Sequence, residues 1–231
     1  MDVKREPVSR RERPAKPALT RHGIVETAMR IMRAEGLEKV TMRRLAQELD
    51  TGPASLYVYV ANTAELHAAV LDALLGEVDL AAGEAGEGWR ERLFAVLSSY
   101  TRVLFEHPQL ARSALVARPS GVNYLRLVER VLGLLAASGA PRGQVAWGVD
   151  NLLLHATATA AEHGTQQRDP ASREDWDALK QAVSAVDETT HPMISAHMPA
   201  LLAGAVEDRL TWGFDVLVNG ITHTPLPAGA D

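Results

Sequence analysis

Histidine is the residue type in this chain best suited to bind a metal ion or transfer protons, and the chain has eight histidines and no cysteine. Their spacing forms no familiar site, because the sequence contains neither H-E-x-x-H nor G-x-S-x-G. His155 and His163 lie two turns apart on one predicted helix, and His191 and His197 flank a proline-containing segment. We therefore predict no metal site, no cofactor and no enzymatic activity. The absence of cysteine excludes disulfides and thiol chemistry.

A second group of residues could contact another molecule without catalysing a reaction. In segment 41–60, two short predicted helices flank a tight turn, and the second begins with small residues followed by two tyrosines. Small residues at the start of a helix let its backbone approach base edges in a DNA major groove. Tyrosine offers a hydroxyl on a rigid apolar ring, which suits phosphate or thymine-methyl contact. The segment predicts a helix-turn-helix; the alternative is a core helical hairpin with ordinary surface tyrosines.

Charge is distributed unevenly along the 231 residues. Residues 1–45 contain 12 Lys and Arg against 6 Asp and Glu, whereas the rest contains 12 basic and 23 acidic residues. A basic end on an acidic body is expected when only that end meets phosphate. Residues 1–19, with three prolines and little apolar content, predict a disordered basic arm.

Apolar residues recur at helical spacing throughout, so we expect an all-α protein. Thr20 and Thr41 are the expected N-caps of the first two helices, and Asn62 or Thr63 caps the fourth. We predict a helix-turn-helix domain at 20–78, a Gly-rich break, a helical body at 88–221 and a flexible tail at 222–231. The predicted helices of the head after the turn span about 53–60 and 64–79. Those of the body span about 89–106, 109–117, 122–138, 142–167, 173–187 and 204–221, with loops at 168–203.

The stretch VTMRRLAQELDTGPASLYVYVANTAELHAAVLDALL, with the preceding EGLEKVT, resembles the DNA-binding domain of the TetR family of transcriptional regulators. Two segments of the body, RPSGVNY and DRLTWGFDVLVNGI, are similar to the regulatory domain of the tetracycline repressors. The resemblance implies a three-helix N-terminal domain followed by a helical regulatory and dimerisation domain.

Within the head, Leu56 and Val60 should face inward, and Arg43 should emerge beside the recognition helix, where it could bind guanine O6 and N7. The resemblance places Arg43 where some members reach a base. Many members also carry a phosphate-binding lysine where this chain has Thr63, so one charge contact is absent. The predicted DNA-binding residues are Arg21, Thr41, Arg43, Arg44, Gly52, Pro53, Ala54, Ser55, Tyr57, Tyr59 and Thr63.

The helix at 142–167 is apolar nearly all round, which is typical of a helix inside a bundle. Its few polar residues either anchor a ligand in an apolar cavity or bond to neighbouring helices, and the sequence leaves both open. The resemblance implies a magnesium–drug chelate held by a histidine in the closest relatives, but Ala114 stands at that position, so we expect neither chelate nor metal. The predicted ligand-binding residues are Tyr100, Arg118, Trp147, Asn151, His155 and Trp176.

Two apolar stripes favour a homodimer, because helices from two subunits could close a four-helix interface, as the family does. Two heads would then reach successive major grooves, about 34–36 Å apart. The alternative is that both stripes are buried within one chain. The predicted interface residues are Val145, Val149, Leu152, Val206, Leu210, Phe214 and Leu217.

These observations predict a ligand-responsive regulator that binds double-stranded operator DNA, most simply a repressor released by a small molecule. The alternatives are a DNA-binding regulator without a small-molecule effector and a helical ligand-binding protein. No apolar run reaches the ~18 residues of a membrane span, and the basic N-terminus lacks the apolar core of a signal peptide. We therefore expect a cytoplasmic protein without a membrane partner.

Overall fold

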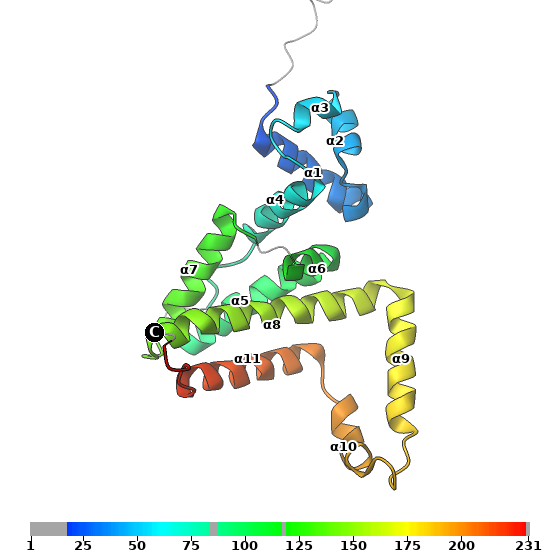
Figure 1. The fold of residues 1–231 in the computed structure, drawn as a ribbon, viewed down its shortest axis with the longest axis vertical. Helices are drawn as coiled ribbons and strands as arrows, with labels where there is room; N and C mark the ends of the chain where they lie inside the picture. Colours follow the sequence, from blue (N-terminus) through cyan, green and yellow to red (C-terminus); the bar gives the residue numbers. More distant parts are fainter. Residues whose placement is uncertain (1–17, 84–86, 117–118, 230–231) are drawn as a thin grey trace, which may run out of the picture.

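The computed structural model describes residues 18–83, 87–116 and 119–229, and the elements in those ranges are all helical (Figure 1). None of these helices is long and apolar enough to cross a membrane. In chain order they are α1 (Arg21–Glu35), the short 3-10 helix η2 (Leu37–Lys39), α2 (Met42–Glu48), α3 (Pro53–Leu56), α4 (Thr63–Leu75), α5 (Trp89–Phe105), α6 (Pro108–Val116), α7 (Val122–Ala136), α8 (Arg142–Arg168), α9 (Pro170–Ser184), α10 (Pro192–Leu202) and α11 (Val206–His223).

Side-chain caps set the starts of the head helices. Thr20 Oγ1 accepts from Gly23 N at 3.0 Å, and Thr41 Oγ1 accepts from Arg44 N at 3.2 Å, as predicted. Of the two candidates for α4, Asn62 is the cap, because its Oδ1 accepts from Glu65 N at 2.9 Å. These bonds satisfy N–H groups that the first turn of a helix leaves without backbone partners.

The third and fourth helices are shorter than predicted. The α3 helix ends at Leu56 and continues as a turn through Tyr57–Tyr59, and α4 ends at Leu75. Leu56 and Val60 are buried, as predicted, whereas Val58 is exposed. A single helical turn is therefore enough to hold α3 in place, because Leu56 and Val60, on either side of the tyrosines, anchor it in the core.

The body is built on α5 and α8, with α7 at one end and α11 running alongside α8 (Figure 1). The α8 and α11 helices pack closely at glycines. A Cβ on Gly148 would lie 2.7 Å from Ile221, and one on Gly213 would lie 2.3 Å from the His155 ring. Larger residues at these two positions would push the helices apart.

The segment 168–203 agrees only in part with prediction, because the helix expected at about 173–187 is present as α9 whereas α10 lies where loops were expected. Pro170 and Pro192 stand in the first turns of these helices, where proline loses no intrahelical hydrogen bond. The two helices, here called the α9–α10 extension (170–202), have no buried residue and project away from the body in Figure 1. Only α10 was not predicted, because Pro192 and Pro199 suggest breaks in a helix whereas α10 begins at the first and contains the second.

Candidate nucleic-acid interface and body cavities

The exposed surface of α3 is formed by small residues. Gly52, Pro53, Ala54 and Ser55 are all exposed, and a Cβ at Gly52 would meet nothing within 4 Å. Tyr57 is 54% exposed beside them. Tyr59 is half-buried against the core. The arrangement gives a supported helix end that another molecule can approach closely.

The turn between α2 and α3 fixes how this surface is presented. Asp50 has a φ of 47°, in the left-handed region that a tight turn requires. Thr51 N donates to Ala46 O at 2.9 Å, which ties the turn back to α2. This bond holds the start of α3 at a defined angle to α2.

The two neighbouring arginines of α2 have different roles. Arg44 donates to Glu35 and Glu48, each at 2.6 Å, and Glu48 also accepts from Arg30 at 2.5 Å. Hydrogen bonds to these arginines lower the pKa of both carboxyls and raise that of Arg44. Arg43 is exposed and has no hydrogen bond or ion pair with any other described residue. The predicted nucleic-acid contact therefore suits Arg43, whereas Arg44 joins α2 to α1.

The remaining predicted contacts lie at the helix starts of the head. The guanidinium of Arg21 lies 3.7 Å from the carboxylate of Glu65, on the surface. Thr63 is exposed, and Glu65 accepts from Ala61 N at 2.7 Å. Because Thr41 Oγ1 already caps α2, Thr41 would assist DNA binding mainly by fixing the start of α2. Sequence reasoning missed the acidic side chain of Glu65 beside Arg21.

The predicted ligand-binding residues of the body do not meet in one cavity. Tyr100 is buried and bonds to Thr157 Oγ1 at 2.7 Å, and burial raises its pKa to about 12. Trp147 and Asn151 lie on the exposed side of α8, so they line none of the interior. The helix is apolar nearly all round, and its sequence therefore did not indicate which side faces inward.

Two further candidates lie apart from Tyr100. The His155 ring packs edge-on against Phe214 with centroids 5.5 Å apart, and its buried Nε2 has no hydrogen-bond partner among the described residues. Trp176, on α9, lines a separate hollow of about 540 Å³ next to α6 and α8. Arg118 lies outside the described residues. The structure therefore does not bring the described candidates together in one cavity, and their role in ligand binding stays a prediction.

The cavity beside Tyr100 opens to the surface and is small, with a volume of about 70 Å³. Its lining combines apolar side chains with the polar groups of Tyr124, Asp150 and Thr157. Ala114, at the position where the resemblance implies a histidine in close relatives, lines it as well. Among the described residues, no group of three His, Asp or Glu side chains could hold a metal ion.

The family model of bacterial regulatory proteins of the tetR family matches residues 24–70, and that of the tetracyclin repressor-like C-terminal domain matches residues 82–224. The chain belongs to the TetR family. It is therefore a DNA-binding transcriptional regulator with an all-helical fold, and the family is not enzymatic. The predicted family, fold class and regulatory function are confirmed.

This TetR-family chain has relatives in Saccharopolyspora and Streptomyces species. It is 31% identical to an HTH-type transcriptional regulator of Saccharopolyspora erythraea, over 90% of this chain and 87% of the relative. The crystal structure of the transcription regulator SCO7704 from Streptomyces coelicolor is 70% identical, covers 92% of this chain and 99% of its own, and superposes with a TM-score of 0.79. The Streptomyces coelicolor protein ActR in complex with actinorhodin is 34% identical, covering 89% and 96%, with a TM-score of 0.77.

In this TetR-family chain the predicted dimer stripes face the interior of one chain. Leu152 and Phe214 are fully buried, Val145, Val149 and Leu210 are 9% exposed or less, and Leu217 packs against the same core. Val206 is partly buried beside a hollow between α5, α8 and α11. The alternative of burial within one chain thus applies to most of this list. The exposed apolar residues of the same two helices are Trp147, Leu154, Trp212 and Val216.

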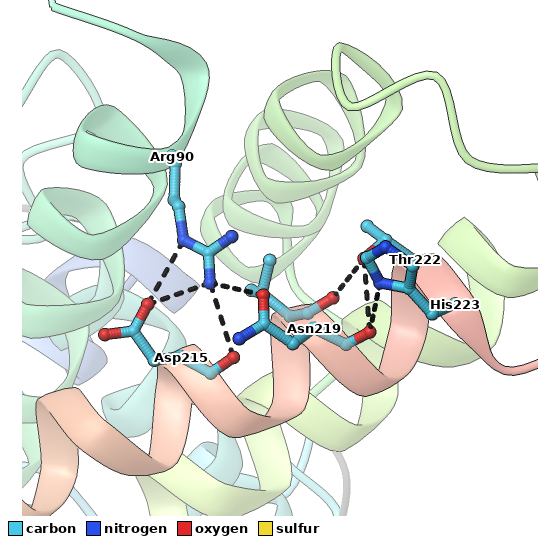
Figure 2. Close-up of polar contacts among 6 residues, drawn as sticks. Arg90, Asp215, Asn219, Thr222 and His223 are labelled. Atoms are coloured by element: carbon cyan, nitrogen blue, oxygen red, sulfur yellow. Dashed lines mark hydrogen bonds and ion pairs between the residues drawn. The ribbon is translucent and has the colours of Figure 1, made fainter.

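An arginine joins the start of α5 to α11. Arg90 donates to the Asp215 carboxylate from Nε at 3.1 Å and from Nη2 at 2.8 Å, and to Asn219 Oδ1 at 2.8 Å (Figure 2). Its guanidinium also lies 5.7 Å from the centre of the Phe94 ring. These contacts fix the α11 surface that carries the exposed tryptophan and valine.

Asp72, on α4, joins the head of this regulator to α7. Its carboxylate accepts from Tyr124 N at 2.9 Å and from Asn123 N at 3.4 Å, and Asn123 Nδ2 donates to the Asp72 carbonyl at 2.9 Å. A Cβ at Gly121 would lie 2.0 Å from this carboxyl group, so only glycine fits there. The first turn of α7 is thus capped from the helix that carries the head.

Proposed function

We propose that this protein is a repressor whose hold on operator DNA is released when a small molecule binds the body. The observation that carries the proposal is the direct connection between the two parts. The α4 helix belongs to the head, yet its Asp72 caps α7, whose Tyr124 lines the cavity beside Tyr100. A change in the cavity would therefore be transmitted to α4 through Tyr124 and Asp72.

The effector that suits this cavity has an apolar body and a few hydrogen-bonding groups. The walls are mainly apolar, and Tyr100, Thr157 and Asp150 supply the polar groups. At about 70 Å³ the cavity is much smaller than typical ligand pockets of ~300–1,000 Å³, so binding requires it to open. A ligand that binds only the opened state shifts the equilibrium by its difference in affinity between the two states. The relative ActR, crystallised with actinorhodin, supports an effector of this kind.

The small volume of this cavity also favours a second candidate function. A regulator without a small-molecule effector would need no interior cavity, and it would respond through a partner protein instead. In that case no compound would release the DNA, and substitutions beside Tyr100 would change stability but not regulation.

We propose that the two predicted domains have separate functions, with a DNA-binding head at 20–78 and a regulatory body at 88–221. In the head, Arg43 and the small residues of α3 would contact base edges, and Arg21 and Tyr57 would contact phosphates. A cytoplasmic location belongs to the same proposal, because operator DNA is reached there.

Dimerisation through the exposed side of α8 and α11 would supply the second head. Trp147, Leu154, Trp212 and Val216 form its apolar residues, and Trp212 is 69% exposed in one chain. We expect Trp212→Glu to produce a monomer with weak operator affinity, measured by light scattering after size exclusion. Met193→Glu, a matched change at an exposed residue of the α9–α10 extension, should leave a dimer. A dimer that persists in Trp212→Glu would reject this surface.

The experiment that tests the proposed function is fluorescence anisotropy with DNA from just upstream of the protein's own gene, at ~50 and ~200 mM salt. Binding through several phosphates should weaken steeply between these concentrations. Compounds are then screened for release of the DNA, and Tyr100→Trp, which fills the cavity, should abolish release while operator affinity stays unchanged. Release that is identical in this variant would contradict the proposed effector site.

A further inference from the structure

A hollow of about 420 Å³ lies where the head meets the body, away from the cavity beside Tyr100. Its head wall is formed by the end of α1 and by η2, with Met32 and Leu37 buried on it. Its body wall comes from the start of α6 and the end of α8, including the buried Leu110 and Thr165. Figure 1 shows α6 lying between the head and the C-terminal half of α8.

Close packing of the body fixes the size of this hollow. A Cβ on Gly164 would lie 3.0 Å from Phe105 O and 3.1 Å from Pro108, so α6 begins directly against α8. On the other side, the ion pair of Arg33 with Glu77 joins α1 to the segment after α4. The wall from α1 and η2 and the wall from α6 and α8 are each fixed by their own contacts, and neither fills the space between them.

Two arginines at this hollow have no counter-ion among the residues that the structure describes. Arg112 comes from α6 and Arg168 from the last turn of α8, and both are exposed. Of the two nearby acids, Asp169 already caps α9, accepting from Ala171 N and Ser172 Oγ at 3.1 Å each. Glu38 lies at the exposed rim over Gly36. The hollow therefore combines a lining of polar and apolar side chains with two exposed guanidinium groups.

We propose that this hollow binds a small organic anion that has a planar apolar body and one carboxylate or sulfonate group. Its volume falls within the ~300–1,000 Å³ of ordinary ligand pockets. The apolar body would lie on Met32, Leu37 and Leu110, and the acid would meet Arg112 and Arg168, whose planar groups suit bidentate binding of an acidic group. His107, kept neutral by a pKa that burial lowers, can offer one more hydrogen bond.

The position of this site gives it a second route to the DNA-binding surface. Because one wall belongs to the head and the other to the body, an occupied hollow stabilises the head position that fits the anion. The anion would then change operator affinity without entering the cavity beside Tyr100. The two sites would be coupled, since each favours particular positions of the same head.

The test uses the full chain without DNA and the fluorescent anion 8-anilinonaphthalene-1-sulfonate as the probe, so its outcome does not depend on the proposed function. We expect the probe's Kd to rise at least tenfold in the double variant Arg112→Gln, Arg168→Gln. The control Arg142→Gln changes an exposed arginine at the other end of α8, about 40 Å away at ~1.5 Å per residue, and should bind the probe as the parent does.

Two further measurements separate this site from general apolar binding. Gln109→Trp, at an exposed position on the lining, should block the hollow and weaken the probe without removing charge. The uncharged probe N-phenyl-1-naphthylamine should be insensitive to the arginine changes. Equal affinity of the anion for the parent and the double variant, or an equal loss in Arg142→Gln, would overturn the proposal. Circular dichroism of each variant confirms that the comparison is between folded proteins.

Discussion

The helices of the head and those of the body begin in different ways, although both parts share one apolar core. In the head, α1, α2 and α4 begin at side-chain caps, and α1 and α2 are joined by ion pairs such as those of Arg44 with Glu35 and Glu48. In the body, α5, α8 and α11 have no side-chain cap, α7 is capped from α4 by Asp72, and α8 and α11 pack through apolar residues and glycines. Removing a cap should therefore destabilise the head helices, and removing apolar volume should destabilise the body.

The largest expected effect is loss of apolar volume in the body. Phe214 is fully buried and packs against Phe94 and His155. Phe214→Ala should lower the free energy of unfolding by about 3–5 kcal/mol, because the cavity it leaves cannot refill completely. Urea denaturation measures this change. Thr211→Ala, at an exposed position on the same helix, should stay within about 0.5 kcal/mol of the parent. A similar loss in both variants would mean that volume is not the deciding factor.

The next effect concerns DNA affinity and distinguishes the two arginines of α2. Arg43→Ala should weaken operator binding by about 1–3 kcal/mol if it reads a guanine, with unchanged thermal stability. Arg44→Ala should instead lower the thermal midpoint, because Glu35 and Glu48 would lose their shared partner. Anisotropy titration and thermal melting are measured on both variants. If Arg43→Ala lowered the thermal midpoint and Arg44→Ala weakened operator binding, the roles of the two arginines would be exchanged.

A smaller effect is expected where the head and the body meet. Asp72→Ala leaves the N–H groups of Asn123 and Tyr124 at the start of α7 without their acceptor. The free energy of unfolding should fall by about 1–2 kcal/mol, as for the loss of a helix cap. Ligand-induced release of DNA should weaken as well. Asp72→Asn keeps an acceptor oxygen and should retain part of both properties; a full loss in Asp72→Asn would point to charge instead.

Loss of one helix cap in the head should lower the free energy of unfolding by less than loss of Asp72. Thr41→Ala removes the acceptor for Arg44 N and should lower the free energy of unfolding by about 1 kcal/mol. Thr41→Ser, which keeps the hydroxyl, should restore most of it. Denaturation followed by circular dichroism gives both values. An unchanged stability in Thr41→Ala would weaken the contrast between capped head and packed body.

The smallest expected effect is a dependence on pH. Burial lowers the pKa of His107 below its usual value, and the charged groups around it are Glu106, Glu77, Arg168 and Arg33. The unfolded chain then binds a proton more readily than the folded one, so stability falls as pH decreases through about 6.5. His107→Gln should reduce the drop in thermal midpoint between about pH 7.5 and pH 5.5. An identical drop in this variant would assign the pH dependence to other groups.

The head could be predicted almost completely from the sequence, because its information is local. Thr20 and Thr41 are caps that lie three residues from the groups they satisfy, and Leu56 and Val60 are set by the spacing around a turn. Such signals need no knowledge of distant segments. Arg44 is the exception, since its partner Glu35 is on another helix and nothing in the spacing indicated it.

The body was predicted less well, because its information is not local. An apolar stripe shows that a helix face is buried but not what covers it, and Val149 and Phe214 pack within their own chain. The direction of Trp147 was equally hidden, since α8 is apolar on nearly every side. The cap that Asp72 provides to α7 joins residues about fifty positions apart, a pairing that no periodic pattern indicates.

The α9–α10 extension has a practical consequence, because it adds length to the chain without contributing to the core. Its turn at 185–191 lies between two helices that have no buried residue. A backbone that is exposed and outside the core tolerates cutting and insertion better than any other part of a fold. A fluorescent domain could therefore be inserted at that turn, which would convert the regulator into a genetically encoded sensor while its core and its DNA-binding surface remain intact.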